Sequence, residues 1–189
     1  IRVLHNTIVV ARDRLPQEGM LCGLVIPFNE GNNRGSVYRN NLVTASLPET
    51  CLVDGRNMPE AFKILGMALP SRADAFLGLT LDHNLWFHPG RPKPFHWGPS
   101  YRATYDYALP EWQALPGSGH GEGDMESDPR LENAAGERPE DFRPADARSP
   151  SIGAGADAGV VEDFAHAPRP KGHRPTIGAF EVSPRAPAP

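Results

Sequence analysis

The chain has 189 residues, a formal net charge of -4, 39% hydrophobic residues and 22% charged residues. This length suits one sizeable domain, or one domain with a tail. Neither half has the density of basic residues that is typical of nucleic-acid binders, and no apolar run approaches the ~18–20 residues that span a bilayer. We therefore expect no nucleic-acid partner and no membrane span.

The chain begins with Ile1, and its first ten residues already have the pattern of the middle of a structure. No charged and then apolar leader precedes them. We interpret this end as a cut edge, made by processing or by truncation. Most of the machinery of any active site is then expected to lie before it.

A weak internal repeat is the most informative feature of the sequence. Residues 3–9, 38–44 and 81–87 each combine a short apolar run with an asparagine at one fixed place. Asparagine tolerates the left-handed backbone that a sharp corner needs, and stacked amides can hydrogen-bond along a file. The repeat therefore predicts strands stacked in parallel, with a structural ladder at the corner. Its members are Asn6, Asn41 and Asn84.

Other segments complete the predicted architecture. Strand-like runs over 21–26 and 50–53 alternate with the repeats. A short helix is predicted over 109–115, where Pro110 stands in the first turn, and a weaker candidate lies at 59–69. Two cysteines, Cys22 and Cys51, allow either one disulfide or two buried thiols, and both alternatives stay open.

Three motifs resemble the right-handed parallel β-helix proteins of the pectate-lyase-like superfamily, which are bacterial extracellular proteins. The first is the His-Asn or Asn-Asn corner before each apolar run. The second is a Trp-Gln helix followed by an acidic Asp-Pro segment. The third is a closing string of short motifs. These motifs stand at 5–6, 40–41, 83–84, 111–113, 126–131, 141–143, 149–155, 174–175 and 177–181.

The resemblance implies an all-β fold, a right-handed parallel β-helix (solenoid) with an irregular Pro/Gly-rich C-terminal cap and one or two short helices. Residues 1–115 would form the last coils, 116–182 the segment that closes the helix, and 183–189 a frayed tail. It also implies secretion, to the extracellular space or the cell surface. The expected partner is a polysaccharide or cell-surface glycan, and the expected state is a monomer.

The family contains polysaccharide lyases, glycoside hydrolases and non-catalytic surface proteins, so its fold does not settle function. Lyases in it generally use a basic residue together with a group that neutralises the substrate carboxylate, frequently Ca²⁺. The predicted function is therefore to act on, or bind, extracellular polysaccharide. The alternative is a non-enzymatic adhesion or structural module, and whether the chain is an enzyme stays open.

The loop over 88–97 is the strongest candidate for substrate contact, although no catalytic residue is singled out. It offers cations for a uronic acid and aromatic rings for sugar stacking. A Pro-rich loop packed against the flank of the fold would explain the same residues without a ligand. The predicted substrate-binding residues are Arg91, Lys93, His96 and Trp97.

Other titratable residues have structural explanations. His5 and His83 share one repeat column with Asn40, and a column residue is usually structural. Asp82 precedes His83, but neighbours along a strand point to opposite faces, which argues against a working pair. The carboxylates of Asp157, Glu162 and Asp163 are candidates for Ca²⁺, yet their spacing matches no known loop, and solvated charges are the preferred interpretation.

Overall fold

The computed structural model describes residues 1–10, 35–45, 79–90, 92–96, 106–115 and 121–182. Short strands form two parallel sheets with the orders β1-β3-β5 and β2-β4-β6-β9, and β7 and β8 form an antiparallel pair. The strands are β1 Arg2–Leu4, β2 Thr7–Val10, β3 Val37–Arg39, β4 Leu42–Ala45, β5 Thr80–Asp82, β6 Leu85–Phe87, β7 Phe95–His96, β8 Asp106–Tyr107 and β9 Met125–Glu126. The helices are α1 Leu109–Gln113 and the 3₁₀ helix η3 Pro139–Phe142.

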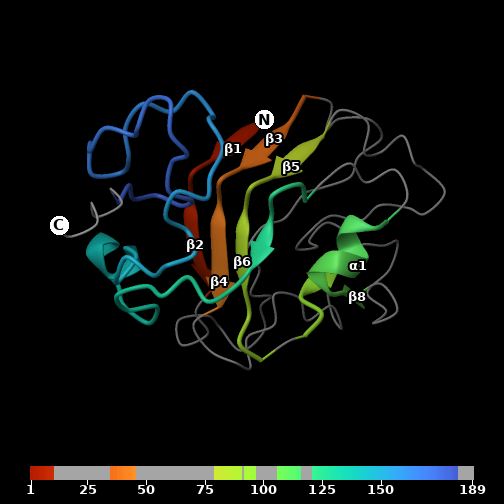
Figure 1. Ribbon diagram of the computed structural model, residues 1–189. Coiled ribbons are helices and arrows are strands. Elements are labelled where there is room, and N and C mark those ends of the chain that lie inside the picture. Colours follow the sequence, from red (N-terminus) through yellow and green to blue (C-terminus); the bar gives the residue numbers. More distant parts are fainter. Residues whose placement is uncertain (11–34, 46–78, 91, 97–105, 116–120, 183–189) are drawn as a thin grey trace.

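The repeat builds three rungs, each made of two strands joined by a two-residue corner. The rungs are β1-β2, β3-β4 and β5-β6. Equivalent residues of neighbouring rungs lie directly beside one another; for example, Leu42 pairs with Leu85, and each of them follows a ladder asparagine. The parallel strands therefore run side by side across both sheets (Figure 1). Parallel pairing in register is what places the repeated residues in columns.

The corner contains a left-handed residue, but it is not the ladder asparagine. His5, Asn40 and His83, each one residue earlier, have φ angles of 54°, 60° and 52°. The prediction that the ladder asparagine itself is left-handed is therefore wrong. Histidine and asparagine are among the non-glycine residues that occur in this region most often. Because the turn is made one residue earlier, the side-chain amide of the ladder asparagine can point along the stack.

Alternating side chains of the rungs fill two separate cores. Val43 and Trp86 point into the larger core, whereas their neighbours Leu42 and Leu85 point into the smaller one. This is the alternation expected of strands that are buried on both faces. The larger core also holds an aromatic cluster in which Trp86 meets Phe95 edge-on, with 5.5 Å between ring centroids. Trp112 of α1 stacks on Phe95 at 5.0 Å.

Helix α1 confirms the predicted helix at 109–115. Glu111 reaches back so that its Oε2 accepts a hydrogen bond of 2.9 Å from the backbone N–H of Ala108. This contact satisfies one of the amides that a helix N-terminus leaves unpaired. Trp112 is fully buried, and it fixes the helix against the larger core.

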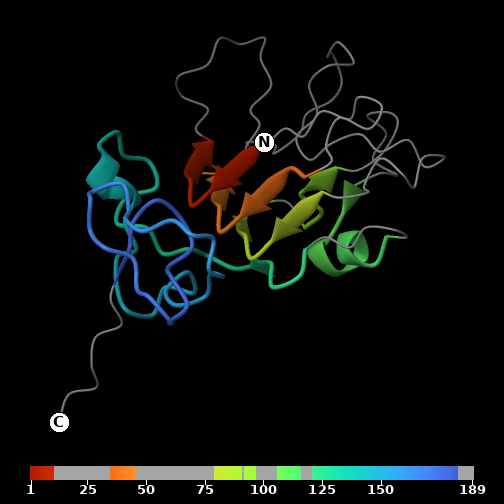
Figure 2. The same cartoon turned by 90° about the horizontal axis from the view of Figure 1, so that it is seen from above.

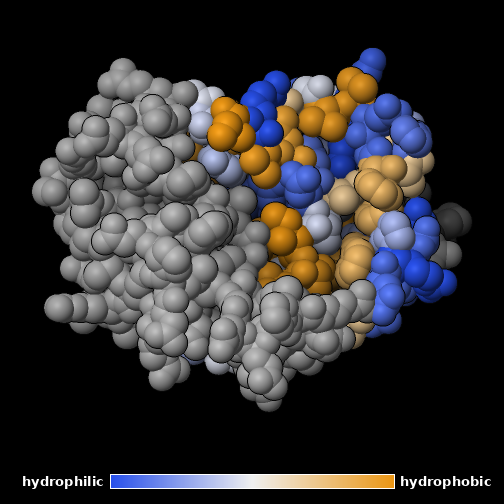
Figure 3. All heavy atoms as spheres, turned by 180° about the vertical axis from the view of Figure 1, so that it is seen from behind, coloured by the Kyte–Doolittle hydropathy of each residue, from blue (hydrophilic) through white to orange (hydrophobic). Residues whose placement is uncertain are grey.

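Residues 149–182, which we call the cover segment, pack along the side of the rungs. Ala154 and Ile177 complete the smaller core around Leu42 and Leu85. The backbone N–H of Gly178 donates to the carbonyl of Asn40 at 2.8 Å. Figures 1 and 2 show the cover segment on one side of the strands and α1 on the other. Seen from behind, hydrophobic residues gather near the middle of the view, and hydrophilic residues are prominent toward the side of the cover segment (Figure 3).

A buried ion pair holds the cover segment together. Arg169 Nη1 lies 2.9 Å from Glu181 Oε2, and the two side chains are 3% and 5% exposed. Arg169 also donates to the carbonyl oxygens of Thr176 and Gly178 at 3.2 and 2.9 Å. These extra hydrogen bonds matter because two charges taken out of water need more than each other to offset their desolvation.

The predicted all-β parallel β-helix is wrong. The described residues form two small parallel sheets of three and four strands together with two short helices, and they are not plainly a solenoid. The physical reason is that each rung has a single recurring corner, which joins two strands. The long part after β9 then has no recurring strand and packs by loops and turns.

Several predicted features lie outside the described residues. These are Cys22, Cys51, the runs at 21–26 and 50–53, the weaker helix at 59–69, and the tail at 183–189. Within the described part of the chain, no helix has the length and apolar character needed to cross a membrane.

Candidate functional site

The corner of the stack carries a continuous file of hydrogen-bonded side chains. Asn6 Nδ2 donates to Asn41 Oδ1, and Asn41 Nδ2 donates to Asn84 Oδ1, both at 3.0 Å. The same oxygens accept the backbone N–H of the preceding asparagine, at 3.1 and 2.9 Å. The structure thus brings the three predicted ladder residues into one column. Asn41 and Asn84 are completely buried, so their amides depend on these partners.

The file ends on a carboxylate. Asp124 Oδ1 accepts from the backbone N–H and the Nδ2 of Asn84 at 2.6 and 3.2 Å, and its Oδ2 accepts from Trp86 Nε1 at 2.8 Å. Desolvation by burial raises the pKa of Asp124 to about 7, although these three hydrogen bonds act in the opposite direction. The nearby Asp82 adds to the increase in the pKa.

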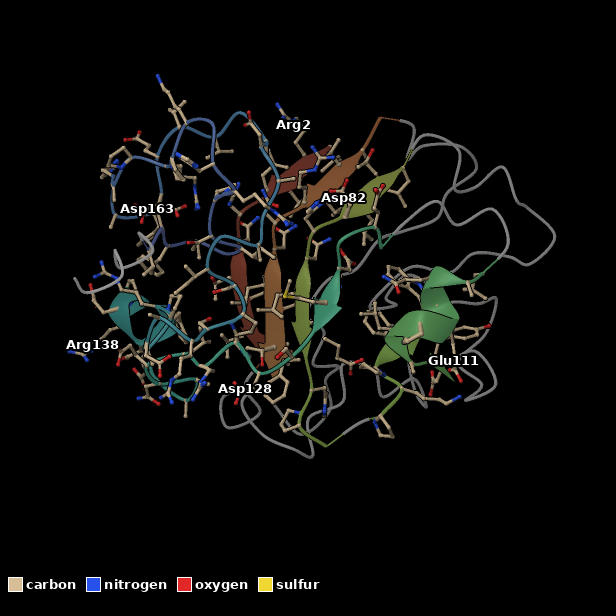
Figure 4. The ribbon with its side chains drawn as sticks, in the orientation of Figure 1. Arg2, Asp82, Glu111, Asp128, Arg138 and Asp163 are labelled. Atoms are coloured by element: carbon tan, nitrogen blue, oxygen red, sulfur yellow. The ribbon has the colours of Figure 1, made fainter. Side chains whose placement is uncertain are left out.

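One face of the β1-β3-β5 sheet points away from the core. Tyr38 and Leu81 point inward and are buried, so their neighbours Arg39 and Asp82 point outward. Leu4 of β1 pairs with Arg39. Arg2 stands two residues before Leu4, so it lies on the same face of the sheet as Arg39, and it is exposed. We call this surface the outward face, and Figure 4 shows Arg2 of β1 and Asp82 of β5 in the upper part of the view.

A bidentate ion pair lies on the outward face. Arg39 Nε and Nη2 each lie 2.6 Å from a different oxygen of Asp82. Their side chains are 27% and 13% exposed, so the pair is partly shielded from water. The hydrogen bond to Asp82 is the main reason why the pKa of Arg39 is raised. Such a fork geometry fixes both side chains, because two parallel bonds define an orientation.

His83 completes a three-residue cluster with this pair. Its Nδ1 lies 3.6 Å from Asp82 Oδ1, just beyond hydrogen-bond distance, and this buried nitrogen has no hydrogen-bond partner among the residues that the structure describes. The side chain is 22% exposed.

The expectation that Asp82 and His83 point to opposite faces is therefore wrong. Side chains alternate between faces only along an extended strand. The backbone of His83 is in the left-handed region, and its φ of 52° turns the ring back toward Asp82. Gly123 lies against the ring, and a Cβ at this position would come within 2.9 Å of His83 Nε2. A glycine here leaves the space that the imidazole occupies.

The cluster has the composition of an oriented base. A carboxylate that faces one imidazole nitrogen favours the tautomer in which that nitrogen carries the proton, which leaves a lone pair on the other. Contacts of this kind are often long without substrate and shorten in the complex. Arg39 holds the carboxylate in place from its other side. This arrangement can take a proton from a substrate on the outward face.

The predicted substrate loop is only partly described. Lys93 is half-exposed, and its Nζ lies 2.9 Å from Glu111 Oε1 of α1. His96 lies in β7, opposite Asp106. Arg91 and Trp97 lie outside the described residues. The structure therefore does not place these four residues together, and substrate binding by them stays a prediction.

The three carboxylates considered for Ca²⁺ have separate partners. Asp157 Oδ1 accepts the backbone N–H of Gly159, and Asp163 Oδ1 accepts those of Ala165 and Ala167. Glu162 lies 3.5 Å from His166. Within the residues that the structure describes, no group of three or more His, Cys, Asp or Glu side chains could hold a metal ion.

His5, which stands in the same column as His83, has a different environment. It is 6% exposed, and its Nε2 accepts a hydrogen bond of 2.8 Å from Asn40 Nδ2. Burial and then the charge of Arg169 lower the pKa of His5 to about 4. Its neutral ring is a packed part of the corner, in contrast to the partly exposed ring of His83.

Comparison with known proteins adds no relative. No family model matches the chain, no curated protein matches it, and no solved structure matches it. The resemblance to the pectate-lyase-like superfamily therefore stays a prediction from motifs. Function has to be argued from the cluster on the outward face.

Proposed function

We propose that the chain is part of an extracellular protein that binds acidic polysaccharide on the outward face and cleaves it by elimination. The observation that supports this proposal best is the cluster of Arg39, Asp82 and His83, in which a partly exposed imidazole faces an anchored carboxylate. The ring is accessible, whereas the equivalent His5 is not.

The elimination step needs a base and a cation. His83 Nε2 takes the proton from the carbon next to the uronic acid carboxylate. The electron pair left behind forms a double bond to the neighbouring ring carbon, and the bond from that carbon to the glycosidic oxygen breaks. The leaving oxygen takes a proton from water, and the hydroxide that remains takes the proton from His83 Nε2. A positioned base of this kind typically contributes about 10²–10⁴-fold to the rate.

The outward face also offers a cation for the substrate. Arg2 is exposed, and its guanidinium donates to the carbonyl of Ala158 at 3.0 Å, which leaves further N–H groups for a carboxylate. Arg39 is already committed to Asp82. Arg2 stands on β1, two strands away from β5, so its role in the proposal is to bind a uronate of the polymer, while Arg39 orients the carboxylate that faces the base.

The test compares wild-type protein with His83→Asn on polygalacturonate, alginate and glycosaminoglycans. Asn40 stands at the equivalent corner with φ of 60°, so asparagine fits the left-handed backbone at this place. Unsaturated product is followed by absorbance, and binding by affinity electrophoresis. We expect wild-type cleavage of one polymer, a loss of roughly 100-fold or more in His83→Asn, and unchanged binding.

His173→Asn is the matched control. His173 is an exposed histidine of the cover segment and does not belong to the cluster of Arg39, Asp82 and His83. Its replacement should leave cleavage unchanged. Wild-type protein that binds no polymer in the panel would contradict the proposal as a whole. Equal cleavage by wild type and His83→Asn would reject His83 as the base.

A non-enzymatic structural or adhesion module is the second candidate. The observation that favours it is the buried amide file, which gives the stack a rigid spine independent of any ligand. Such a module would bind a glycan without releasing unsaturated product. The same assay therefore separates the two candidates.

A further inference from the structure

A tight loop over residues 161–169 projects from the cover segment. Its two ends pair where the backbone N–H of Arg169 donates to the carbonyl of Val161 at 2.9 Å. Inside the loop, the backbone N–H of Asp163 donates to the carbonyl of Ala167, and Asp163 Oδ1 accepts two backbone amides at 2.8 Å each. The loop is thus fixed from within, on a buried aspartate.

The base of the loop is fixed as well. Asp163 Oδ2 accepts the backbone N–H of Glu181 at 2.8 Å, and Arg169 pairs with the side chain of the same residue. Asp163 and Arg169 are 8% and 6% exposed. Figure 4 places Asp163 on the side of the cover segment. Two buried charges therefore hold a short loop whose other side chains point into solvent.

Phe164 stands at the tip of this loop and is 64% exposed. Its backbone N–H donates to the carbonyl of Ala179 at 2.9 Å. Its ring meets the buried Phe180 edge-on, with 5.6 Å between centroids, and the guanidinium of Arg143 lies 4.8 Å over the ring of Phe180. The orientation of the exposed ring is thus set before any ligand arrives, which lowers the cost of binding.

The polar neighbours of Phe164 match the needs of a sugar. Glu162 and His166 flank it in the loop, with side chains 56% and 84% exposed. An aromatic ring packs against the C–H face of a pyranose, and adjacent polar groups bind its hydroxyls. A stable protein interface needs about 800 Å² from each partner with an apolar centre. A single phenyl ring between a carboxylate and an imidazole is the size of one sugar ring.

We propose that Phe164 is a sugar-stacking platform, with Glu162 and His166 as its hydroxyl-binding neighbours. This inference rests on the proposed function, because it adds a second contact for the same acidic polysaccharide. The residues just before the loop contact the outward face. Arg39 Nη1 and Arg2 Nη2 donate to the carbonyls of Asp157 and Ala158, three or four residues before the loop begins. The segment that leads into the loop therefore borders the outward face.

The experiment measures dissociation constants for polygalacturonate, alginate and hyaluronan by affinity electrophoresis. Phe164→Ala is compared with wild type and with Phe164→Trp. Val161→Ala is the matched control, since Val161 belongs to the same loop and is 67% exposed but offers no ring. Thermal unfolding of each variant checks that the fold is kept.

We expect Phe164→Ala to weaken binding about 5-fold or more, while Phe164→Trp and Val161→Ala bind as well as wild type or better. Cleavage of a short oligosaccharide that does not reach the loop should be unchanged in Phe164→Ala. Wild-type binding that is equal in Phe164→Ala would overturn the platform and leave the proposed function standing. Absence of wild-type binding to all three polymers would overturn both.

Discussion

At the scale of single residues, the corner shows how one backbone angle changes what a sequence pattern means. The recurring asparagines could be recognised from the sequence as a stacked column. The positive φ angle, however, belongs to the residue before each asparagine. Because the sequence does not show this, the contact between Asp82 and His83 could not be predicted. Alternation predicts opposite faces only while the chain stays extended. No simple sequence signal distinguishes His83, whose ring is accessible, from His5, whose ring is buried by the cover segment.

The ladder predicts a contrast between a buried and an exposed asparagine. Asn84→Ala leaves the backbone N–H and Nδ2 of Asn41 without their acceptor in a buried site, and we expect a loss of about 2–4 kcal/mol in the free energy of unfolding. Asn6→Ala removes an exposed end and should cost under about 1 kcal/mol. Denaturant unfolding of both variants measures the difference. Equal losses would show that the file is not what stabilises the corner.

Asp124 and His5, two buried groups near the corner, should change the free energy of unfolding with pH in opposite directions. Asp124 has a folded-state pKa of about 7 against an ordinary value of 3.8, so between about pH 4 and 7 the unfolded chain releases a proton that the folded chain keeps. Its contribution to stability therefore falls as pH rises. His5 has a folded-state pKa of about 4 against 6.5, so its contribution is lost as pH falls through that window.

Single variants separate these two effects. The stability of wild type relative to Asp124→Asn should decrease from pH 4 to pH 7, whereas that of wild type relative to His5→Asn should increase. Asn40 shows that asparagine is accepted at the left-handed corner. Unfolding curves at a series of pH values give both differences. Slopes of the same sign would contradict the assignment of the two pKa directions.

At the scale of elements, the cover segment holds its shape without regular strands. Its organisation depends on buried polar contacts centred on Arg169, Glu181 and Thr176, whose hydroxyl donates to Glu181 Oε1 at 2.9 Å. An ordered, irregular segment could be predicted from its Pro and Gly content and its short apolar pieces. The ion pair of Arg169 and Glu181 could not be predicted, because the two residues are 12 positions apart in a segment without periodicity.

Breaking the buried ion pair should be costly. Arg169→Met leaves Glu181 as an uncompensated charge that is 5% exposed, and we expect a loss of about 3–5 kcal/mol. The double variant Arg169→Met/Glu181→Gln should recover part of that loss, since no lone charge remains. The exposed pair of Arg148 and Asp146 is the control, and Arg148→Met should change stability little. Chemical denaturation measures all three.

At the scale of the whole molecule, the structure contains less repetition than the sequence suggested. Three rungs could be aligned from the recurring asparagines, and they do pair in parallel register. The extension to a solenoid was wrong because a repeat of three short units gives only two small sheets. Closure then comes from elsewhere: α1 and β7 fill the larger core, and the cover segment fills the smaller one.

Since the smaller core is shared, the sheets and the cover segment should unfold together. Ile177 is 1% exposed and contacts the rungs, and we expect Ile177→Ala to cost about 2–5 kcal/mol. The midpoint should shift equally when it is followed by tryptophan fluorescence and by hydrogen exchange at Gly178. Two separate transitions would show that the cover segment is an independent unit.

The file of amides also has a direction. Every link donates from the N-terminal rung toward Asp124, so the bond dipoles add head to tail, as peptide dipoles do in a helix. The carboxylate sits where the hydrogens point, which is the positive pole. The opposite pole, at the exposed Asn6, is electron-rich. A further hydrogen-bond donor stacked on Asn6 would therefore extend the file in the same direction.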